Sequence, residues 1–160
     1  MTIAVGDRLP EGTLWRRADE GVQALPVRDV FAGRRVLLFA VPGAFTPTCS
    51  DTHLPGYVMH ADELKAKVDA IVCVAVNDAH VMRAWSRVNH AEAIEMLADG
   101  NCEWTRALGL TRDLTGTGLG IRSQRYAALI EDGVVRRLWI EPARGVTVSG
   151  AEAVLAALSA

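Results

Sequence analysis

Apolar residues gather in short runs that predict strands, and these runs are separated by stretches with helical or polar spacing. The runs at 36–41 and 71–76 are almost continuously apolar, which is typical of strands buried on both faces of a sheet. Shorter apolar runs flank Glu131-Asp132-Gly133, the clearest turn signal in the chain, and predict a hairpin over 126–140. A second hairpin is indicated near the N-terminus, where weak alternation surrounds the turn-like segment 18–21.

Helical segments are expected between these strands. Thr48 or Cys49 opens a helix that Pro55-Gly56 kinks or ends early, and Asp78 is suited to cap the next one. Residues 149–152 have the spacing of a capping box before an alanine-rich terminal helix. Further expected segments are helices over 59–68, 78–89 and 104–108 (ending at Gly109), a short strand at 94–97 and a flexible loop at 116–120. This order indicates an α/β protein with a mixed central sheet flanked by helices and an N-terminal hairpin extension.

Length and composition indicate one domain over residues 1–160 with a substantial core, since 50% of residues are hydrophobic and 22% are charged. The net charge is −2 and opposite charges are interspersed, which argues against binding to nucleic acid or to a membrane. Residues 1–7 lack the basic and apolar regions of a secretory signal, and no apolar segment is long enough to span a bilayer. We therefore expect a cytoplasmic protein.

The cysteines are Cys49, Cys73 and Cys102, and no two of them form a C-x-x-C pair. This pattern argues against a disulfide-stabilised secreted fold and against a dithiol reductase. Cys49 and His53 have i, i+4 spacing, but no second cluster offers the remaining ligands of a zinc site, so we expect no metal and no bound cofactor. Cys73 lies in an apolar run, where a thiol packs as a small hydrophobe, whereas Cys102 is the more exposed candidate for a second redox role.

The most informative segment is 42–49, which follows the first buried strand. It combines a turn rich in proline and glycine with a thiol at the expected start of a helix. Backbone N–H groups without carbonyl partners and the helix dipole favour negative charge at such a place. A cysteine there ionises easily, and the thiolate is its nucleophilic form. The segment therefore predicts a reactive cysteine rather than a structural thiol.

The sequence Pro42-Gly43-Ala44-Phe45-Thr46-Pro47-Thr48-Cys49 resembles the peroxidatic motif of the peroxiredoxins in their Prx5, or type II, form. The family signature Pro-x-x-x-Thr-x-x-Cys is met by Pro42, Thr46 and Cys49. The similarity continues through four further segments: 74–78, 97–100, 107–110 and 118–127.

The resemblance implies a thioredoxin-like fold, a homodimer, and reduction of hydrogen peroxide and organic hydroperoxides through a sulfenic acid on Cys49. It also implies that Arg125 is the catalytic arginine, with Arg122 as the nearest alternative. Animal relatives resolve the oxidised cysteine with an internal cysteine near the C-terminus, but that place falls at about Ser149 here, and no cysteine lies beyond Cys102. The chain is therefore more similar to the single-cysteine type II enzymes, which are reduced by an external thiol such as glutathione, glutaredoxin or thioredoxin.

Each residue of the motif has an expected role. Arg125 would hold thiolate and peroxide together, because its guanidinium is always charged and offers several donors in one plane. Thr46 would accept from the peroxide hydroxyl and donate to the sulfur or an oxygen, although it could also be a turn residue only. Pro42, which has no N–H, would shield the thiol from water. Thr48 and Phe45 would contact substrate, and Phe45 is alternatively a dimer contact.

Two other functions fit the same reactive thiol. A redox sensor or holdase would use an ionised, accessible cysteine without rapid turnover, and an oxidation rate near that of a free thiolate would favour it. A thiol–disulfide oxidoreductase is disfavoured because Thr46 stands where the first cysteine of a C-x-x-C pair would be. The leading hypothesis is a thiol-dependent peroxidase.

Overall fold

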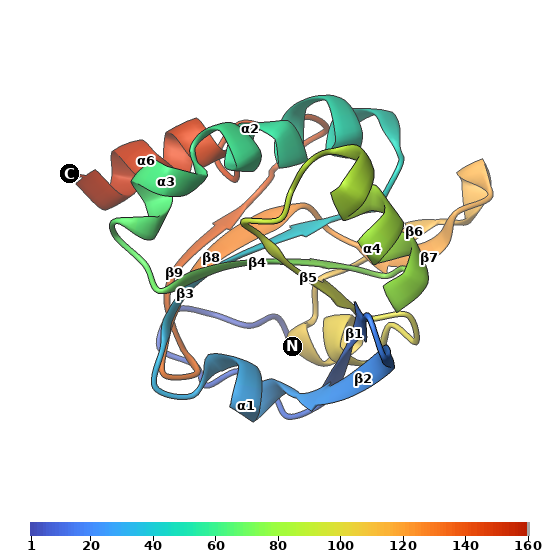
Figure 1. The fold of residues 1–160 in the computed structure, drawn as a ribbon, viewed down its shortest axis with the longest axis horizontal. Helices are drawn as coiled ribbons and strands as arrows, with labels where there is room; N and C mark the ends of the chain where they lie inside the picture. Colours follow the sequence, from blue (N-terminus) through green and yellow to red (C-terminus); the bar gives the residue numbers. More distant parts are fainter. Residues whose placement is uncertain (160) are drawn as a thin grey trace.

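The computed structural model describes residues 1–159 and is built around a 7-stranded sheet in the order β2-β1-β5-β4-β3-β8-β9 (Figure 1). Strand β3 is parallel to β4 and antiparallel to β8, so the predicted α/β class with a mixed sheet is confirmed. The strands are β1 (Thr13–Ala18), β2 (Gly21–Pro26), β3 (Arg35–Val41), β4 (Ala70–Ala75), β5 (Glu95–Ala98), β8 (Tyr126–Glu131) and β9 (Val134–Ile140).

The two continuously apolar runs form the centre of this sheet. All residues of β4 are buried, as are all residues of β3 after Arg35, because helices cover both faces. Both predicted hairpins are present, as β1–β2 and β8–β9. In the second hairpin Asp132 and Gly133 have φ angles of 48° and 78°, and two positive φ values in a two-residue loop suit the twist of the paired strands.

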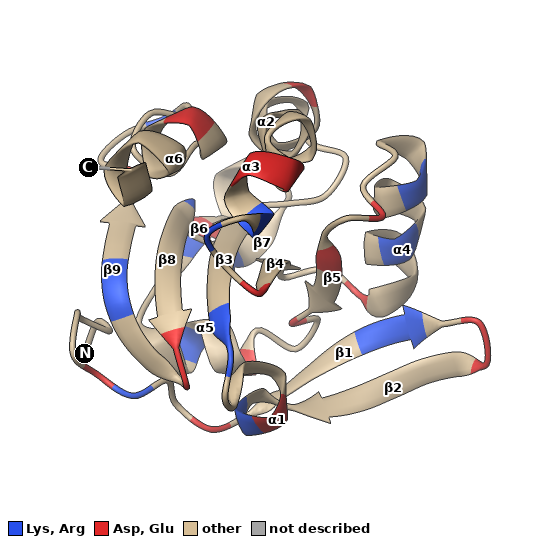
Figure 2. Ribbon diagram, turned by 60° about the vertical axis from the view of Figure 1, so that its left-hand side comes forward, with Lys and Arg blue, Asp and Glu red and all other residues tan. Residues whose placement is uncertain are grey.

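Helices lie on both faces of the sheet (Figure 1). Alternate residues of β3 face the two layers: Phe39 packs with residues of α2, α3, α4 and α6, whereas Leu38 packs with residues of α1 and α5. The helices are α1 (Val27–Phe31), α2 (Leu54–Met59), α3 (Ala61–Lys65), α4 (Ala79–Val88), α5 (Glu103–Leu108) and α6 (Ala151–Ser159). Acidic and basic residues are spread over both layers and the sheet (Figure 2).

Several predicted boundaries lie where expected. The Asp78 carboxylate caps α4 by accepting from the Val81 N–H at 2.9 Å. Strand β5 begins at Glu95, one residue after its predicted start. Helix α5 ends at Gly109, whose φ of 72° is a left-handed conformation that glycine adopts without strain.

The helix that was expected to be kinked or ended by Pro55-Gly56 has a different form. After a helical turn that begins at Pro47 it widens into a π-helix, η1 (Cys49–His53), and continues as α2 through the proline. Pro55 has no N–H for the usual bond to the residue four positions earlier, and the wider π-helical turn before it accommodates this. The predicted helix over 59–68 is also wrong in extent, because His60 interrupts the segment and α3 ends at Lys65.

The loop predicted at 116–120 belongs to a small hairpin. Strands β6 (Thr111–Leu114) and β7 (Gly120–Ser123) pair in a separate 2-stranded sheet, and the 3-10 turn η2 (Thr115–Thr117) lies between them. Figure 1 shows this hairpin projecting beyond the main sheet. Its strands are mostly half-buried and polar, so no apolar alternation marked them in the sequence.

The C-terminal helix forms as predicted, but without the expected capping box. The Ser149 hydroxyl donates to a carboxylate oxygen of Glu141 at 2.6 Å, and the Gly150 carbonyl accepts the first helical bond, from the Val154 N–H. Within residues 1–159, no helix combines the length and apolar character that crossing a membrane requires.

Candidate active site

The buried thiol of Cys49 lies at the start of η1, after the turn that ends β3. Arg125 precedes β8, the antiparallel neighbour of β3, and the sheet therefore brings residues 76 positions apart into contact. The Arg125 Nη2 donates to Cys49 Sγ at 3.2 Å, and only 8% of the Arg125 surface is exposed. A guanidinium held this close favours negative charge on the sulfur.

His53 fixes the second nitrogen of the same guanidinium. Arg125 Nη1 donates to His53 Nδ1 at 2.9 Å, so the His53 Nε2–H donates to the Ser149 carbonyl at 3.0 Å. Burial lowers the pKa of His53 to about 4. The Arg125 charge acts in the same direction, whereas the bond to the Ser149 carbonyl acts in the opposite direction. The imidazole is therefore neutral near pH 7 and orients Arg125. The sequence predicts a packing or hydrogen-bonding role for His53 near the first helix turn, and the structure identifies its partners as Arg125 and Ser149.

A further set of bonds holds Ser149 behind His53. The Ser149 carbonyl also accepts from the Tyr57 hydroxyl at 2.7 Å. Glu141 accepts from the N–H and hydroxyl groups of both Ser149 and Thr147, and its own N–H donates to the Arg125 carbonyl at 3.0 Å. Although burial alone would raise it, these hydrogen bonds lower the pKa of Glu141 to about 2. No local motif in the sequence marks this set, although Glu141, Thr147 and Ser149 are close together in the chain.

The residues of the turn before Cys49 only partly have the predicted contacts. The Thr46 hydroxyl donates to the Gly43 carbonyl at 2.6 Å, so its proton is not directed at the sulfur as expected, and its lone pairs are left to accept. Pro42 is buried, and its carbonyl accepts from Arg122 Nη1 at 3.4 Å, which places Arg122 on the turn and not on the thiol. Phe45 does not line the cavity beside Cys49. Its φ is 65° and its side chain is 52% exposed, so the alternative prediction for this residue, a dimer contact, stays a prediction.

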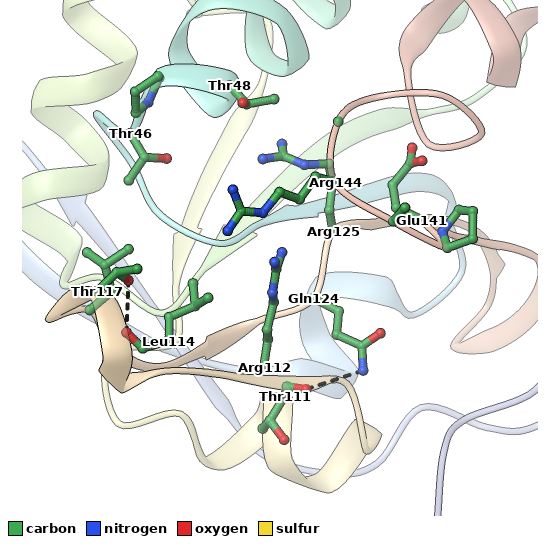
Figure 3. Close-up of a pocket in the computed structure, with 15 residues that line it drawn as sticks. Thr46, Thr48, Thr111, Arg112, Leu114, Thr117, Gln124, Arg125, Glu141 and Arg144 are labelled. Atoms are coloured by element: carbon green, nitrogen blue, oxygen red, sulfur yellow. Dashed lines mark hydrogen bonds between the residues drawn. The ribbon is translucent and has the colours of Figure 1, made fainter.

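A cavity of about 580 Å³ opens beside this thiol (Figure 3). Thr46, Thr48 and Arg125 form its wall next to Cys49, whose own side chain is fully buried behind them. Arg112 and Arg144 line the same cavity. In the described part of the chain, no three His, Cys, Asp or Glu side chains gather as metal ligands would.

The other two cysteines are buried free thiols. Burial raises the pKa of Cys73, which lies within β4, well above its ordinary value. Burial also raises the pKa of Cys102, with Arg106 acting in the opposite direction. Cys102 is 4% exposed, so the expectation of an exposed thiol is wrong. Its N–H donates to the Asp99 carbonyl in the turn before α5, and its carbonyl accepts from the Arg106 N–H within the helix.

Comparisons with known proteins identify the family of this chain. A family model described as Redoxin matches residues 4–155. The chain is 53% identical to "Peroxiredoxin-2E-2, chloroplastic" of Oryza sativa subsp. japonica over 98% of this chain and 73% of that one, and 48% identical to "Peroxiredoxin-2C" of the same plant over 98% of each. The crystal structure of reduced Prx3 from Vibrio vulnificus in complex with hydrogen peroxide matches with a TM-score of 0.95 at 55% identity, over 98% of this chain and 99% of that one.

The thioredoxin-like fold holds one buried cysteine at the start of a helix, and an arginine donates to its sulfur. This arrangement defines a thiol-dependent peroxidase. Within that class, the chain belongs to the peroxiredoxin family in its type II, or Prx5, form. Enzymes of this family use thiol reductants and need no prosthetic group.

The neutral state of His53 gives a testable pH dependence. Its pKa of about 4 in the folded protein lies below the ordinary value of 6.5, so the unfolded chain binds a proton between these values that the folded chain does not. We therefore expect His53 to contribute a loss of about 2 kcal/mol of folding stability as the pH falls from 7 to 5. Urea unfolding at both pH values measures it. Between pH 7 and pH 5 the variant His53→Gln should lose less folding stability than the wild type, by that amount. An equal loss in both proteins would contradict a neutral His53.

Proposed function

We propose that this peroxidase reduces hydrogen peroxide and organic hydroperoxides at Cys49 through a sulfenic acid, and that an external thiol, glutathione alone or with glutaredoxin, regenerates the thiolate. The observation that carries the first half is the hydrogen bond from Arg125 to the Cys49 sulfur at 3.2 Å. The second half is supported by the buried positions of Cys73 and Cys102.

In the oxidative step, the Cys49 thiolate attacks one peroxide oxygen. An S–O bond forms while the O–O bond breaks, and the second oxygen leaves with the electron pair and takes up a proton. The sulfur is thereby oxidised by two electrons and the peroxide is reduced. A thiol of ordinary pKa, about 8.5, is a few per cent ionised near pH 7, and full ionisation gives only a few-fold gain because nucleophilicity falls with basicity. Most of the acceleration must therefore come from orientation and charge stabilisation.

Arg125 and Thr46 supply these two effects. The Arg125 guanidinium is fixed by His53 on one nitrogen and donates to the sulfur from the other, so its charge lies where negative charge moves from sulfur to oxygen. The Thr46 hydroxyl, whose proton is used by the Gly43 carbonyl, presents lone pairs to the peroxide O–H. Pro42 is buried on the same turn and offers no N–H to compete for the peroxide.

The reductive step depends on a thiol from outside the chain. Cys73 is fully buried within β4, and Cys102 is enclosed before α5. Ser149, at the place of the partner cysteine of animal relatives, is used in the bonds to His53 and Glu141. The Cys49 sulfur is fully buried, so a thiol larger than a peroxide reaches it only when the turn from Thr46 into η1 moves outward.

Mass spectrometry of the peroxide-treated protein tests this route. With one equivalent of hydrogen peroxide, we expect a sulfenic acid on Cys49, trapped with dimedone, and with glutathione present we expect a glutathione adduct on the same residue. Peptide mapping identifies the modified cysteine. A disulfide between Cys49 and either Cys73 or Cys102 would overturn the single-cysteine route while leaving the peroxidase step intact.

A further inference from the structure

Three arginine side chains line the cavity beside Cys49, and the peroxide step uses only Arg125. Arg112 comes from β6, in the small hairpin, and Arg144 comes from the segment after β9. Figure 3 shows the Arg112 side chain extending towards that of Arg125, with the Arg144 side chain beside Arg125. Arg112 and Arg144 come from two segments other than the turn that carries Cys49. They give the cavity positive charge that the peroxide step does not use.

This positive charge is only partly offset by the protein, because one ionised carboxylate, that of Glu141, lines the same cavity. Within residues 1–159, neither Arg112 nor Arg144 has a carboxylate within ion-pair distance. Glu141 lines the cavity, but both of its oxygens accept from Thr147 and Ser149. Asp113, next to Arg112 in the chain, accepts from the Thr115 N–H. The cavity therefore offers unpaired guanidinium groups, whose fixed fork of donors suits carboxylates.

The size of the cavity points in the same direction. A volume of about 580 Å³ far exceeds what hydrogen peroxide occupies, because even a water molecule in the liquid takes up only about 30 Å³. Pockets of roughly 300 to 1,000 Å³ hold small organic ligands. A molecule of tripeptide size with carboxylates at its ends would fill the space between Arg112, Arg144 and the wall formed by Thr46 and Thr48.

We propose that Arg112 and Arg144 bind the carboxylates of a small anionic thiol, which is the reductant that reduces oxidised Cys49. This inference rests on the proposed function for its chemical step. In that step the incoming thiolate attacks the sulfenic sulfur, an S–S bond forms, and the S–O bond breaks with release of hydroxide, which a proton converts to water. A second thiolate of the same kind then attacks the mixed disulfide, and the Cys49 thiolate leaves while a disulfide of the reductant is released.

The arginines have a second effect on the same step. A cluster of fixed positive charge attracts an anionic reductant and favours the thiolate form of its sulfur, which is the attacking species. Both effects weaken as salt rises, because Arg112 is half-buried and Arg144 is exposed. We therefore expect the reductive step with glutathione to slow with ionic strength, and the same step with an uncharged thiol to change little.

The first test compares two thiols on pre-oxidised protein in stopped-flow experiments. Glutathione carries two carboxylates, and its diethyl ester carries none. At low salt we expect the wild type to react about tenfold faster with glutathione, and the double variant Arg112→Gln, Arg144→Gln to lose most of this preference. Arg137→Gln is the matched control, since Arg137 is exposed on β9 and lies outside the cavity. An unchanged preference in the double variant would overturn the proposal.

The second test separates this inference from the peroxidase function. S-methylglutathione cannot react, so calorimetric titration of the reduced protein measures binding alone; we expect weaker binding by about tenfold in the double variant and no change in Arg137→Gln. Equal binding by all three proteins contradicts the arginine site even if peroxide turnover is rapid. Conversely, slow oxidation of Cys49 by hydrogen peroxide contradicts the proposed function and leaves the binding result standing. If the double variant instead slows oxidation by a carboxylated hydroperoxide only, the bound anion is the oxidant, and the assignment to the reductant is wrong.

Discussion

Replacement of Cys49 by serine is expected to reduce peroxide consumption to the background rate of the added thiol. A serine hydroxyl remains protonated near pH 7 and its oxygen cannot be oxidised by a peroxide, so neither the nucleophile nor the sulfenic acid exists in the variant. The fold should survive, because the two side chains differ by one atom and Arg125 keeps its bond to His53. Peroxide loss in the presence of glutathione, with circular dichroism as a check of folding, measures the effect.

The matched controls for this prediction are Cys73→Ala and Cys102→Ala, which also remove a buried thiol. Both should keep peroxide turnover, since neither residue forms a hydrogen bond with Arg125 or lines the cavity. Wild-type turnover in Cys49→Ser would place the nucleophile elsewhere. If the wild type is oxidised no faster than a free thiolate, the redox sensor, which uses the same thiol without rapid turnover, becomes the better interpretation.

The sequence predicted those parts of the fold that one-dimensional patterns determine. Strands β3 and β4 were found because both of their faces are buried, which leaves an apolar run that no polar residue interrupts. The turn at Asp132 and Gly133 was found because few residues tolerate positive φ. By contrast, β6 and β7 are partly exposed on both faces and have no such pattern.

The candidate site divides in the same way. Cys49 and Thr46 lie in one short motif, and Arg125 stands out only through the family resemblance. The residues that orient Arg125 could not be predicted, because the contact of His53 with Ser149 joins positions 96 residues apart. Ser149 was even assigned a different role, in a capping box, since its spacing to Glu152 fits that motif locally. In the folded protein the Ser149 hydroxyl instead donates to the Glu141 carboxylate.

Replacement of Arg125 by lysine tests whether the geometry of the guanidinium is needed or only its charge. Arg125 donates from two nitrogens at once, to the Cys49 sulfur and to His53, and the single ammonium of lysine cannot reproduce both bonds in the same plane. Removal of one such donor to developing charge typically lowers a rate by about 100- to 1,000-fold. We expect a loss of this size in the second-order rate constant for oxidation by hydrogen peroxide, and a slightly larger loss for Arg125→Gln, which also removes the charge.

The measurement is the fall in rate of Cys49 oxidation in stopped-flow experiments over a range of pH. If Arg125 acts by favouring the thiolate alone, Arg125→Lys should lose little activity and Arg125→Gln should regain the wild-type rate at alkaline pH, where the thiol ionises without help. If it also holds the peroxide and stabilises the leaving oxygen, the deficit should remain at high pH. We expect the second result, because ionisation by itself yields only a few-fold gain. Full recovery at high pH would reduce the role of Arg125 to ionisation, and the acceleration would then have to come from Thr46 and the backbone of the turn.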